Sequence, residues 1–361
     1  MKGGQSSYPL VTCVYSAVTR GPDRAPSPPT VRLQRGDPIV LSWNRRTRTR
    51  VRTRGRVRTR TGAAALALAL AVAVVPAAAQ AAPGGAAPET TAPGAAPSDA
   101  PAAAPTAASG AWNDDSCRTT PERPRPVVLV HGTLGNSVTN WVGLAPYLAD
   151  RGWCVFSLDY GRLPGVAVFH GLGPIEDSSA ELAAYVDRVL AVTGADEVDL
   201  VGHSQGGMMP RHYLKHHDGA AEKVNALVAL SPATNGSTVL GLTKLFDLFP
   251  GARDVLEGLT PALEQQIAGS PFLTELNADG YTVPGVEYTV IATRYDEVVT
   301  PYRSQFIDEP GVTNVLLQDL CPVSLSEHLA IALVDRVAWH EVTNALDPAN
   351  ARPSTCWSVF D

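Results

Sequence analysis

The segment Gly202-His203-Ser204-Gln205-Gly206 constrains this chain more than any other part of the sequence. It follows the segment Val198-Asp199-Leu200-Val201, which we predict to be a strand, and it precedes a helix-like segment from Met208 to Leu214. A G-x-S-x-G turn between a strand and a helix is the nucleophile-elbow pattern. Side chains two residues on either side of the serine would collide in so tight a turn, so glycines are needed there. Ser204 is therefore expected to stand out over the edge of a sheet as a nucleophile.

The rest of the body alternates short apolar runs with amphipathic segments. We predict strands at 127–130, 154–158, 198–201, 224–230, 286–292 and 312–317. We predict helices at 140–149, 176–190 and 208–214, with a final long helix at about 327–346. Pro146 fits only a first helical turn, so the helix at 140–149 is expected to begin late. This alternation predicts an α/β fold with a mostly parallel sheet and helices on both faces.

One stretch interrupts the alternation. Residues 232–285 contain no strong strand pattern but do contain apolar patches, among them Val239 to Leu242 and Leu245 to Phe249. An apolar insertion outside the sheet favours a cap or lid over a substrate pocket. The alternative is an ordinary packed helical excursion.

A serine nucleophile needs a base and an acid that orients the base. After a nucleophile elbow these follow in the chain order Ser, Asp or Glu, His. Asp296 comes shortly after the strand at 286–292 and is the expected acid, with Glu297 as its close rival. His328 follows the last strand and is the expected base, whereas His340 lies within the last predicted helix and is expected to be structural or exposed.

The oxyanion of such an enzyme is held by two backbone amides. One should belong to Gln205, just after the nucleophile. The other should come from the loop His131-Gly132-Thr133-Leu134-Gly135-Asn136, where we expect the amide of Thr133. The alternative for this loop is a merely structural glycine-rich turn. Histidines that precede Asp296 in the chain do not fit the order Ser, Asp or Glu, His, so none of them is expected to be the base. The pair His216-His217 is most simply a solvated helix end.

The first 111 residues differ in composition from the body. Residues 51–81 pass from an Arg-rich stretch to the apolar run Ala63 to Val75 and then to small residues, which is the order of a cleaved secretory signal. The alternatives are an uncleaved signal anchor and a nucleic-acid-binding arm. Residues 1–50 read as a non-native or dispensable extension, with the true start near Val51. Residues 82–111 form an Ala/Pro-rich spacer expected to be disordered, and 112–361 form the catalytic domain.

Charge and cysteine usage agree with this division. The chain carries −6 overall, but residues 1–81 hold 14 of its 29 Lys and Arg and only 2 of its 35 Asp and Glu, which leaves about −18 for the remainder. Such an acidic body argues against nucleic acid as a partner. Setting aside Cys13, four cysteines remain, and an even number in an exported protein predicts two disulfides from three connectivities. We favour Cys117–Cys154 and Cys321–Cys356. No cysteine or histidine spacing suggests zinc, and no ligand cluster indicates calcium.

Four runs together resemble the secreted actinobacterial triacylglycerol lipases and esterases of the α/β-hydrolase superfamily. They are Val127 to Asn136, Asp199 to Leu214, Ile291 to Tyr302 and Gln318 to His328. The resemblance implies an α/β-hydrolase fold, hydrolysis of lipid-like carboxylic esters, no organic cofactor and an extracellular setting. We expect a monomer with no transmembrane segment in its mature form.

Other classes remain open on the sequence. A polyester depolymerase, thioesterase, acyltransferase or simple esterase would have the same triad. A non-catalytic binding relative would have lost a member of the triad, whereas candidates for all three members are present in this sequence.

Overall fold

The computed structural model describes residues 110–252, 256 and 260–360. The predicted extension at 1–50, the signal region at 51–81 and all but the end of the spacer at 82–111 lie outside these residues. A seven-stranded sheet in the order β1-β3-β2-β4-β5-β6-β7 forms the centre, and every neighbouring pair of strands is parallel. The predicted mostly parallel sheet is therefore confirmed.

Six of the strands match predicted runs closely, and β1 was not predicted. The strands are β1 Ala111–Trp112, β2 Val127–Val130, β3 Cys154–Leu158, β4 Val198–His203, β5 Val224–Leu230, β6 Glu287–Ala292 and β7 Val312–Leu316. The helices are α1 Leu144–Ala149, α2 Ile175–Thr193, α3 Gln205–His216, α4 Val239–Leu248, α6 Pro261–Gln265, α7 Pro271–Leu276, α8 Leu317–Leu320, α9 Ala330–Leu333 and α10 Arg336–Leu346. β1 has only two residues, too few for a hydrophobic pattern to reveal it.

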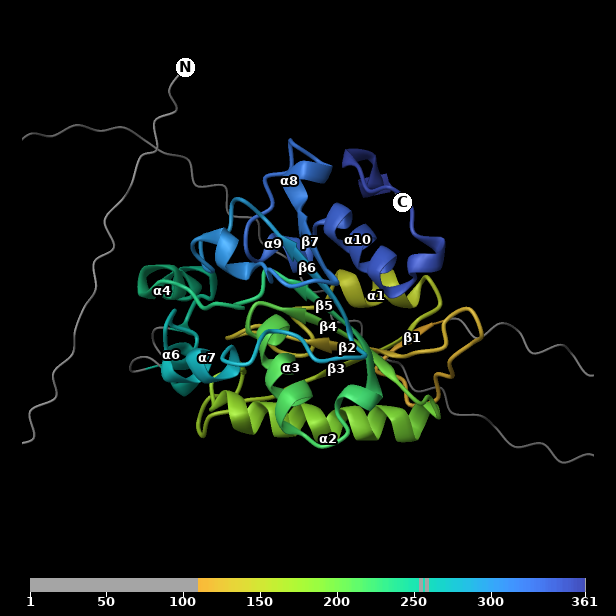
Figure 1. Cartoon of the computed structure of the whole chain (residues 1–361), viewed down its shortest axis with the longest axis horizontal. Coiled ribbons are helices and arrows are strands. Elements are labelled where there is room, and N and C mark those ends of the chain that lie inside the picture. The colour runs from red at the N-terminus through yellow and green to blue at the C-terminus, as the bar shows by residue number, and fades with distance from the viewer. Residues whose placement is uncertain (1–109, 253–255, 257–259, 361) are drawn as a thin grey trace, which may run out of the picture. The chain divides into compact units, whose positions relative to one another are not determined.

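Helices cover both faces of the sheet, with α2 and α3 on one side and α1 and α10 on the other (Figure 1). Alternate residues of β2 enter two different cores. Val128 and Val130 belong to the core that contains residues of α2 and α3, whereas Val127 and Leu129 belong to the core that contains residues of α1 and α10. Because successive side chains of a strand point to opposite faces, a strand buried on both faces must be apolar throughout, as β2 is.

The prediction of one long helix at 327–346 is wrong. The segment instead forms α9 and α10, separated at Val334 and Asp335. Asp335 has an extended backbone, and its carboxylate accepts the amide N–H of Ala338 at 2.9 Å. An aspartate in this position begins a new helix by satisfying one of its unpaired amides. The helix predicted at 140–149 does begin late, at Leu144, which puts Pro146 in the first turn.

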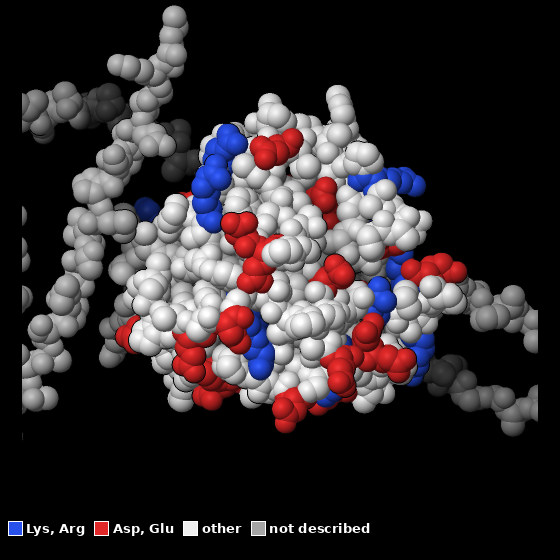
Figure 2. Space-filling model, in the orientation of Figure 1, with Lys and Arg blue, Asp and Glu red and all other residues white. Residues whose placement is uncertain are grey.

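Two disulfides link the favoured cysteine pairs, Cys117–Cys154 and Cys321–Cys356. The first joins the segment before β2 to the start of β3, and the second joins the segment after α8 to the C-terminal turn. Figure 2 shows acidic side chains gathered along the edge of this view where α2 lies. Among the described residues, no helix combines the length and the apolar character needed to cross a membrane.

Candidate active site

Ser204 lies at the turn between β4 and α3, where its backbone has φ +57° and ψ −121°. Positive φ is unfavourable for a residue with a side chain, so the surrounding turn must hold it in place. A Cβ atom at Gly202 would overlap the carbonyl group of Gly206, and one at Gly206 would overlap the carbonyl oxygens of Val130 and His131. The two glycines therefore allow the tight turn that the sequence pattern predicts.

His328 lies between Ser204 and Asp296. Its Nε2 atom is 3.0 Å from Ser204 Oγ, and its Nδ1 atom is 2.8 Å from Asp296 Oδ2. Asp296 has three further donors, because the amides of Val298 and Val299 donate to Oδ1 and the side chain of Gln305 donates to Oδ2 at 2.9 Å. With Oδ2 accepting the Nδ1 proton, Nε2 is left with the lone pair that faces the serine.

Burial and charge compete in setting the pKa values of this pair. Burial acts to lower the pKa of His328, but the adjacent Asp296 carboxylate outweighs it, so this pKa lies above its ordinary value. Burial acts to raise the pKa of Asp296, but His328 and the donated hydrogen bonds outweigh it, so this pKa lies below its ordinary value. The carboxylate is therefore ionised at neutral pH and stabilises positive charge on the imidazole.

The structure separates the other candidates from this cluster. Glu297 does not reach the imidazole ring: its carboxylate accepts the backbone N–H of His328 at 3.4 Å. His340 is buried in α10, with Nδ1 2.6 Å from Ser354 Oγ. At the end of α3, His217 Nε2 is 3.0 Å from Ser179 Oγ, and His216 packs beside His212.

His203 was not singled out from the sequence, although it lies within the elbow. Its Nε2 atom is 2.9 Å from the carbonyl oxygen of His328. Burial lowers the pKa of His203 to about 3, so its ring has a single proton, which we place on Nε2 because a carbonyl can only accept. His203 thus ties the elbow to the loop that carries the base. In the sequence, the position of His203 beside the nucleophile points to a role. Its hydrogen-bond partner could not be predicted, because that partner is a backbone atom of a distant segment.

A second set of bonds fixes the loop that leads to His328. Gln318 donates to Thr293 Oγ1 at 3.0 Å and to the carbonyl oxygen of Ser324 at 3.2 Å. Thr293 in turn donates to the carbonyl oxygen of Ser326. The Cys321–Cys356 disulfide lies at the start of the same loop. These bonds join the segments that follow β6 and β7, so Asp296 and His328 are held by neighbouring strands.

The loop after β2 lies against the elbow. The amide of Leu134 donates to His170 O, and that of Gly135 donates to Gly132 O. Thr133 Oγ1 accepts the side-chain amides of Gln205 at 3.2 Å and of Gln266 at 2.9 Å. The Thr133 hydroxyl therefore serves to hold this loop. The amide of Gln205 is the first of α3 and has no intrahelical partner.

The insertion at 232–285 contains α4, α6 and α7, which lie together at one side of the sheet in Figure 1. Its residue Gln266 contacts Thr133, and Ala262 donates its amide to Leu172 O. Ser237 donates to the carbonyl oxygen of Val298, two residues after Asp296. The insertion is thus bonded both to the loop after β2 and to the loop of the acid. Ser204 is only 2% exposed in this arrangement.

Comparison with known proteins agrees with the observed fold. The family described as "alpha/beta hydrolase fold" matches residues 125–258, which include the loop after β2 and the elbow. Lipase B of Aspergillus fumigatus has a similar structure, with 23% sequence identity and a TM-score of 0.51 over 64% of this chain and 54% of that chain. The chain has the α/β-hydrolase fold, as the sequence resemblance implies.

Curated relatives are similar over shorter stretches. A triacylglycerol lipase of Pseudarthrobacter phenanthrenivorans is 38% identical over 92 residues, 24% of this chain and 27% of the relative. Lipase lipl-5 of Caenorhabditis elegans is 32% identical over 146 residues, 36% of each chain. The chain thus spans only about a quarter to a third of the length of these relatives.

Proposed function

We propose that this α/β-hydrolase-fold protein is a serine carboxylic-ester hydrolase and that triacylglycerols are its preferred substrates. The observation that carries the proposal is the continuous chain of contacts from Ser204 Oγ through His328 to Asp296, with separations of 3.0 and 2.8 Å. Such an arrangement turns a weakly nucleophilic hydroxyl into a reactive one. The similarity to triacylglycerol lipases favours lipid-like esters over other acyl compounds.

In the proposed mechanism, His328 takes the proton of Ser204 as Oγ attacks the ester carbonyl. Asp296 stabilises the imidazolium that forms, and the amides of Thr133 and Gln205 hold the oxyanion. The protonated His328 then gives its proton to the departing alcohol, which leaves an acyl group on Ser204. Water, deprotonated by the same imidazole, attacks the acyl group, and the fatty acid is released while Ser204 regains its proton.

We also propose that the insertion at 232–285 is a cap over the acyl-binding site. Two observations support this role: Ser204 is almost fully buried, and Gln266 of the insertion bonds to Thr133 in the proposed oxyanion loop. A cap that touches the oxyanion loop must shift before a bulky lipid ester reaches the nucleophile. This arrangement favours substrates presented at an oil–water interface.

Substitution of Ser204 by alanine tests the activity. We expect S204A to lose roughly 10⁵- to 10⁶-fold in kcat on a chromogenic acyl ester, because His328 and Asp296 have no other nucleophile to activate. The matched control is S116A, which changes an exposed serine bonded to Asp114 and should retain full turnover. Activity of a folded S204A close to that of the wild type would refute the assignment.

A substrate series tests the preference for triacylglycerols. We expect the rate to rise with acyl chain length and to increase further when the triglyceride forms an emulsion. A preference for short soluble esters without any gain at the interface would instead indicate an esterase. Faster turnover of polyester films or thioesters, or acyl transfer to an added alcohol, would indicate the other classes that have this triad.

We further propose that the enzyme is secreted and monomeric. The two disulfides support an oxidising compartment, since such bonds rarely persist in the cytosol. N-terminal sequencing of the native precursor and of the exported protein tests the start near Val51 and cleavage before the spacer. A precursor that begins at Met1 would contradict the first expectation, and sedimentation as a dimer would contradict the monomer.

A further inference from the structure

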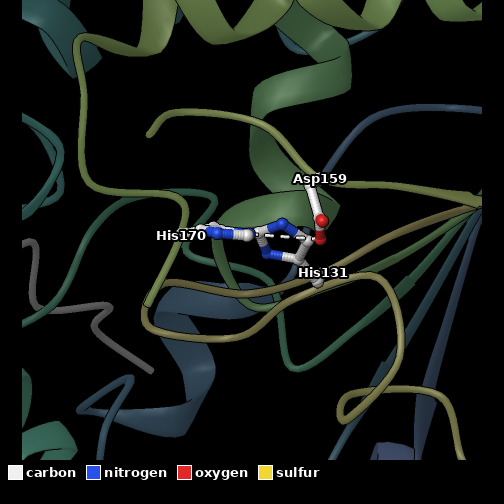
Figure 3. A group of neighbouring side chains, drawn as sticks. All are labelled: His131, Asp159 and His170. Carbon is white, nitrogen blue, oxygen red and sulfur yellow. Dashed lines mark ion pairs between the residues drawn. The ribbon is translucent and has the colours of Figure 1, made fainter. Parts of the chain in front are cut away.

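A second group of histidine and carboxylate side chains lies at the carboxyl ends of β2 and β3. His131 directly follows β2, Asp159 directly follows β3, and His170 lies in the loop between Asp159 and α2. β2 and β3 are parallel neighbours in which Val130 pairs with Leu158, so His131 and Asp159 leave the sheet side by side. Figure 3 shows the three side chains close together, with a dashed line marking the ion pair between His170 and Asp159.

The potential ligand atoms of the three side chains all lie within 4.8 Å of one another. Both histidines are buried, and the side chain of Asp159 is 24% exposed, which leaves a route from solvent. His170 Nδ1 is 3.1 Å from Asp159 Oδ1. The other carboxylate oxygen, Oδ2, is 3.1 Å from the exposed guanidinium of Arg162. The negative charge of Asp159 is therefore only partly balanced.

The hydrogen bond of His131 to a backbone carbonyl leaves its other ring nitrogen with a lone pair. His131 Nδ1 is 2.8 Å from the carbonyl oxygen of Gly132, so Nδ1 carries the proton and Nε2 is the lone-pair nitrogen. Among the described residues, His131 Nε2 has no hydrogen-bond partner although it is fully buried, and the buried His170 Nδ1 faces the Asp159 carboxylate. An unpaired buried nitrogen costs free energy unless something binds it.

The same arrangement is typical of metal ligands. A metal-binding histidine usually donates its second ring N–H to a backbone carbonyl, which fixes the tautomer, and His131 does this. The ring is further held by stacking on Tyr160, with 4.2 Å between ring centroids.

We propose that His131, Asp159 and His170 bind a divalent transition metal ion, with Zn²⁺ as the best match. Two imidazoles and one carboxylate are a donor set that Zn²⁺ accepts in tetrahedral geometry, with water in the fourth position. The ligands would be His131 Nε2, His170 Nδ1 and Asp159 Oδ1, the last also accepting the amide of Ser137 at 2.6 Å. Small side-chain movements are needed to bring these atoms to about 2.0–2.2 Å from the ion.

The proposed ion would act on the structure and not in the chemical step. His131 is the first residue of the oxyanion loop, and the backbone of His170 is bonded to that loop at both Leu134 and Gly135. An ion bound to both histidines would therefore tie together the two chain segments that shape the loop. Binding to the folded state alone would also raise the melting temperature.

Metal titration of the full chain tests the proposal. After dialysis against a chelator, the wild type should bind one equivalent of Zn²⁺ by calorimetry, and Co²⁺ in its place should show the intense visible absorption of a four-coordinate ion. We expect H170Q and D159N to bind Zn²⁺ at least about 100-fold more weakly, since each loses one of three protein ligands. At a Zn²⁺ concentration about 100 times Kd, the melting temperature of the wild type should rise by about 5 °C.

The matched control is H216Q, which removes an exposed imidazole from the separate histidine group at the end of α3. This variant should bind Zn²⁺ as the wild type does. If H216Q loses the ion while H170Q and D159N retain it, the metal site lies at α3 and the proposal is wrong. A wild type that binds no stoichiometric Zn²⁺ overturns the proposal outright.

Imidazole ¹⁵N spectra of the wild type keep the proposal testable if the variants fail to fold. One equivalent of Zn²⁺ should shift one Nε2 and one Nδ1 resonance, those of His131 and His170. Shifts confined to other histidines would contradict the assignment. Hydrolysis is not used as the readout, so failure of the metal proposal and failure of the proposed function are distinguishable.

Discussion

Two histidine–carboxylate groups lie at the same edge of the sheet, yet their hydrogen bonds differ. His328 has both ring nitrogens engaged, one by Asp296 and the other by Ser204. In the group of His131, Asp159 and His170, His131 Nε2 is buried without a hydrogen-bond partner among the described residues, and His170 Nδ1 faces Asp159 at 3.1 Å. The same residue types thus suit proton transfer in one place and metal binding in the other. What a histidine can do depends on its partners more than on its proximity to a carboxylate.

The largest expected effect on activity comes from removing the charge of Asp296, and removal of the Asp159 charge provides the comparison. D296N should lower kcat/KM by about 10⁴-fold, because the neutral amide no longer stabilises the imidazolium. The wild-type pKa of His328 is raised by Asp296, so activity should rise with pH through that elevated value. Removing the charge leaves burial to lower the pKa of His328, so the acidic limb of the kcat/KM profile should move to lower pH.

D159N is the control for this prediction. It removes the charge of the partly exposed Asp159 carboxylate but leaves Asp296 in place, so the acidic limb of the kcat/KM profile should stay at its wild-type position. An equal shift of the acidic limb in D296N and D159N would show that the two histidine–carboxylate groups are electrostatically coupled. It would contradict the separate roles proposed for them.

The two disulfides provide a second comparison, and the effects expected on stability and kcat are of intermediate size. They close loops of nearly equal length, with sequence separations of 37 residues for Cys117–Cys154 and 35 for Cys321–Cys356. Loss of either should therefore cost a similar amount, about 3–4 kcal/mol of unfolding free energy. Only C321S/C356S should also lower kcat, by roughly tenfold, because it loosens the loop that carries His328.

Chemical denaturation and steady-state kinetics of the two double variants measure these effects. C117S/C154S serves as the matched control, with a similar loss of stability and no change in kcat. A decrease in kcat of the same size in both would mean that general destabilisation, and not the position of His328, limits the rate.

The smallest expected effect concerns the positioning of Asp296. Gln305 is buried and donates to Asp296 Oδ2, the oxygen that also faces His328. Q305M should lower kcat by about tenfold at unchanged KM, because the carboxylate loses a hydrogen bond that orients it. The partly exposed Gln265, which donates to Glu176, provides the control Q265M, whose kcat should be that of the wild type. A rise in KM without a change in kcat would assign Gln305 to substrate binding instead.

The sequence predicted the parts of the molecule that depend on local physics. Buried parallel strands are mostly apolar, so β2, which is apolar throughout, and β3 and β5, which each contain one polar residue, were located to the residue. The final helix was predicted wrongly because apolar spacing continues across Asp335, and whether an aspartate begins a new helix depends on its backbone conformation. The sequence favoured Asp296 and kept Glu297 as a rival, since the two carboxylates are adjacent in one loop, and only their three-dimensional positions separate them.

By itself the sequence determined the elbow at Ser204, because the glycines and the flanking strand and helix all lie within a few residues. It also indicated that Asp296 and His328 follow later strands, since chain order is preserved in this fold. Only the tertiary structure decided which strands are neighbours. That order placed His131 beside Asp159, brought His170 to both, and set His203 against the backbone of His328. Contacts between distant segments arise from the packing of strands and loops, which the residues of one segment alone do not determine.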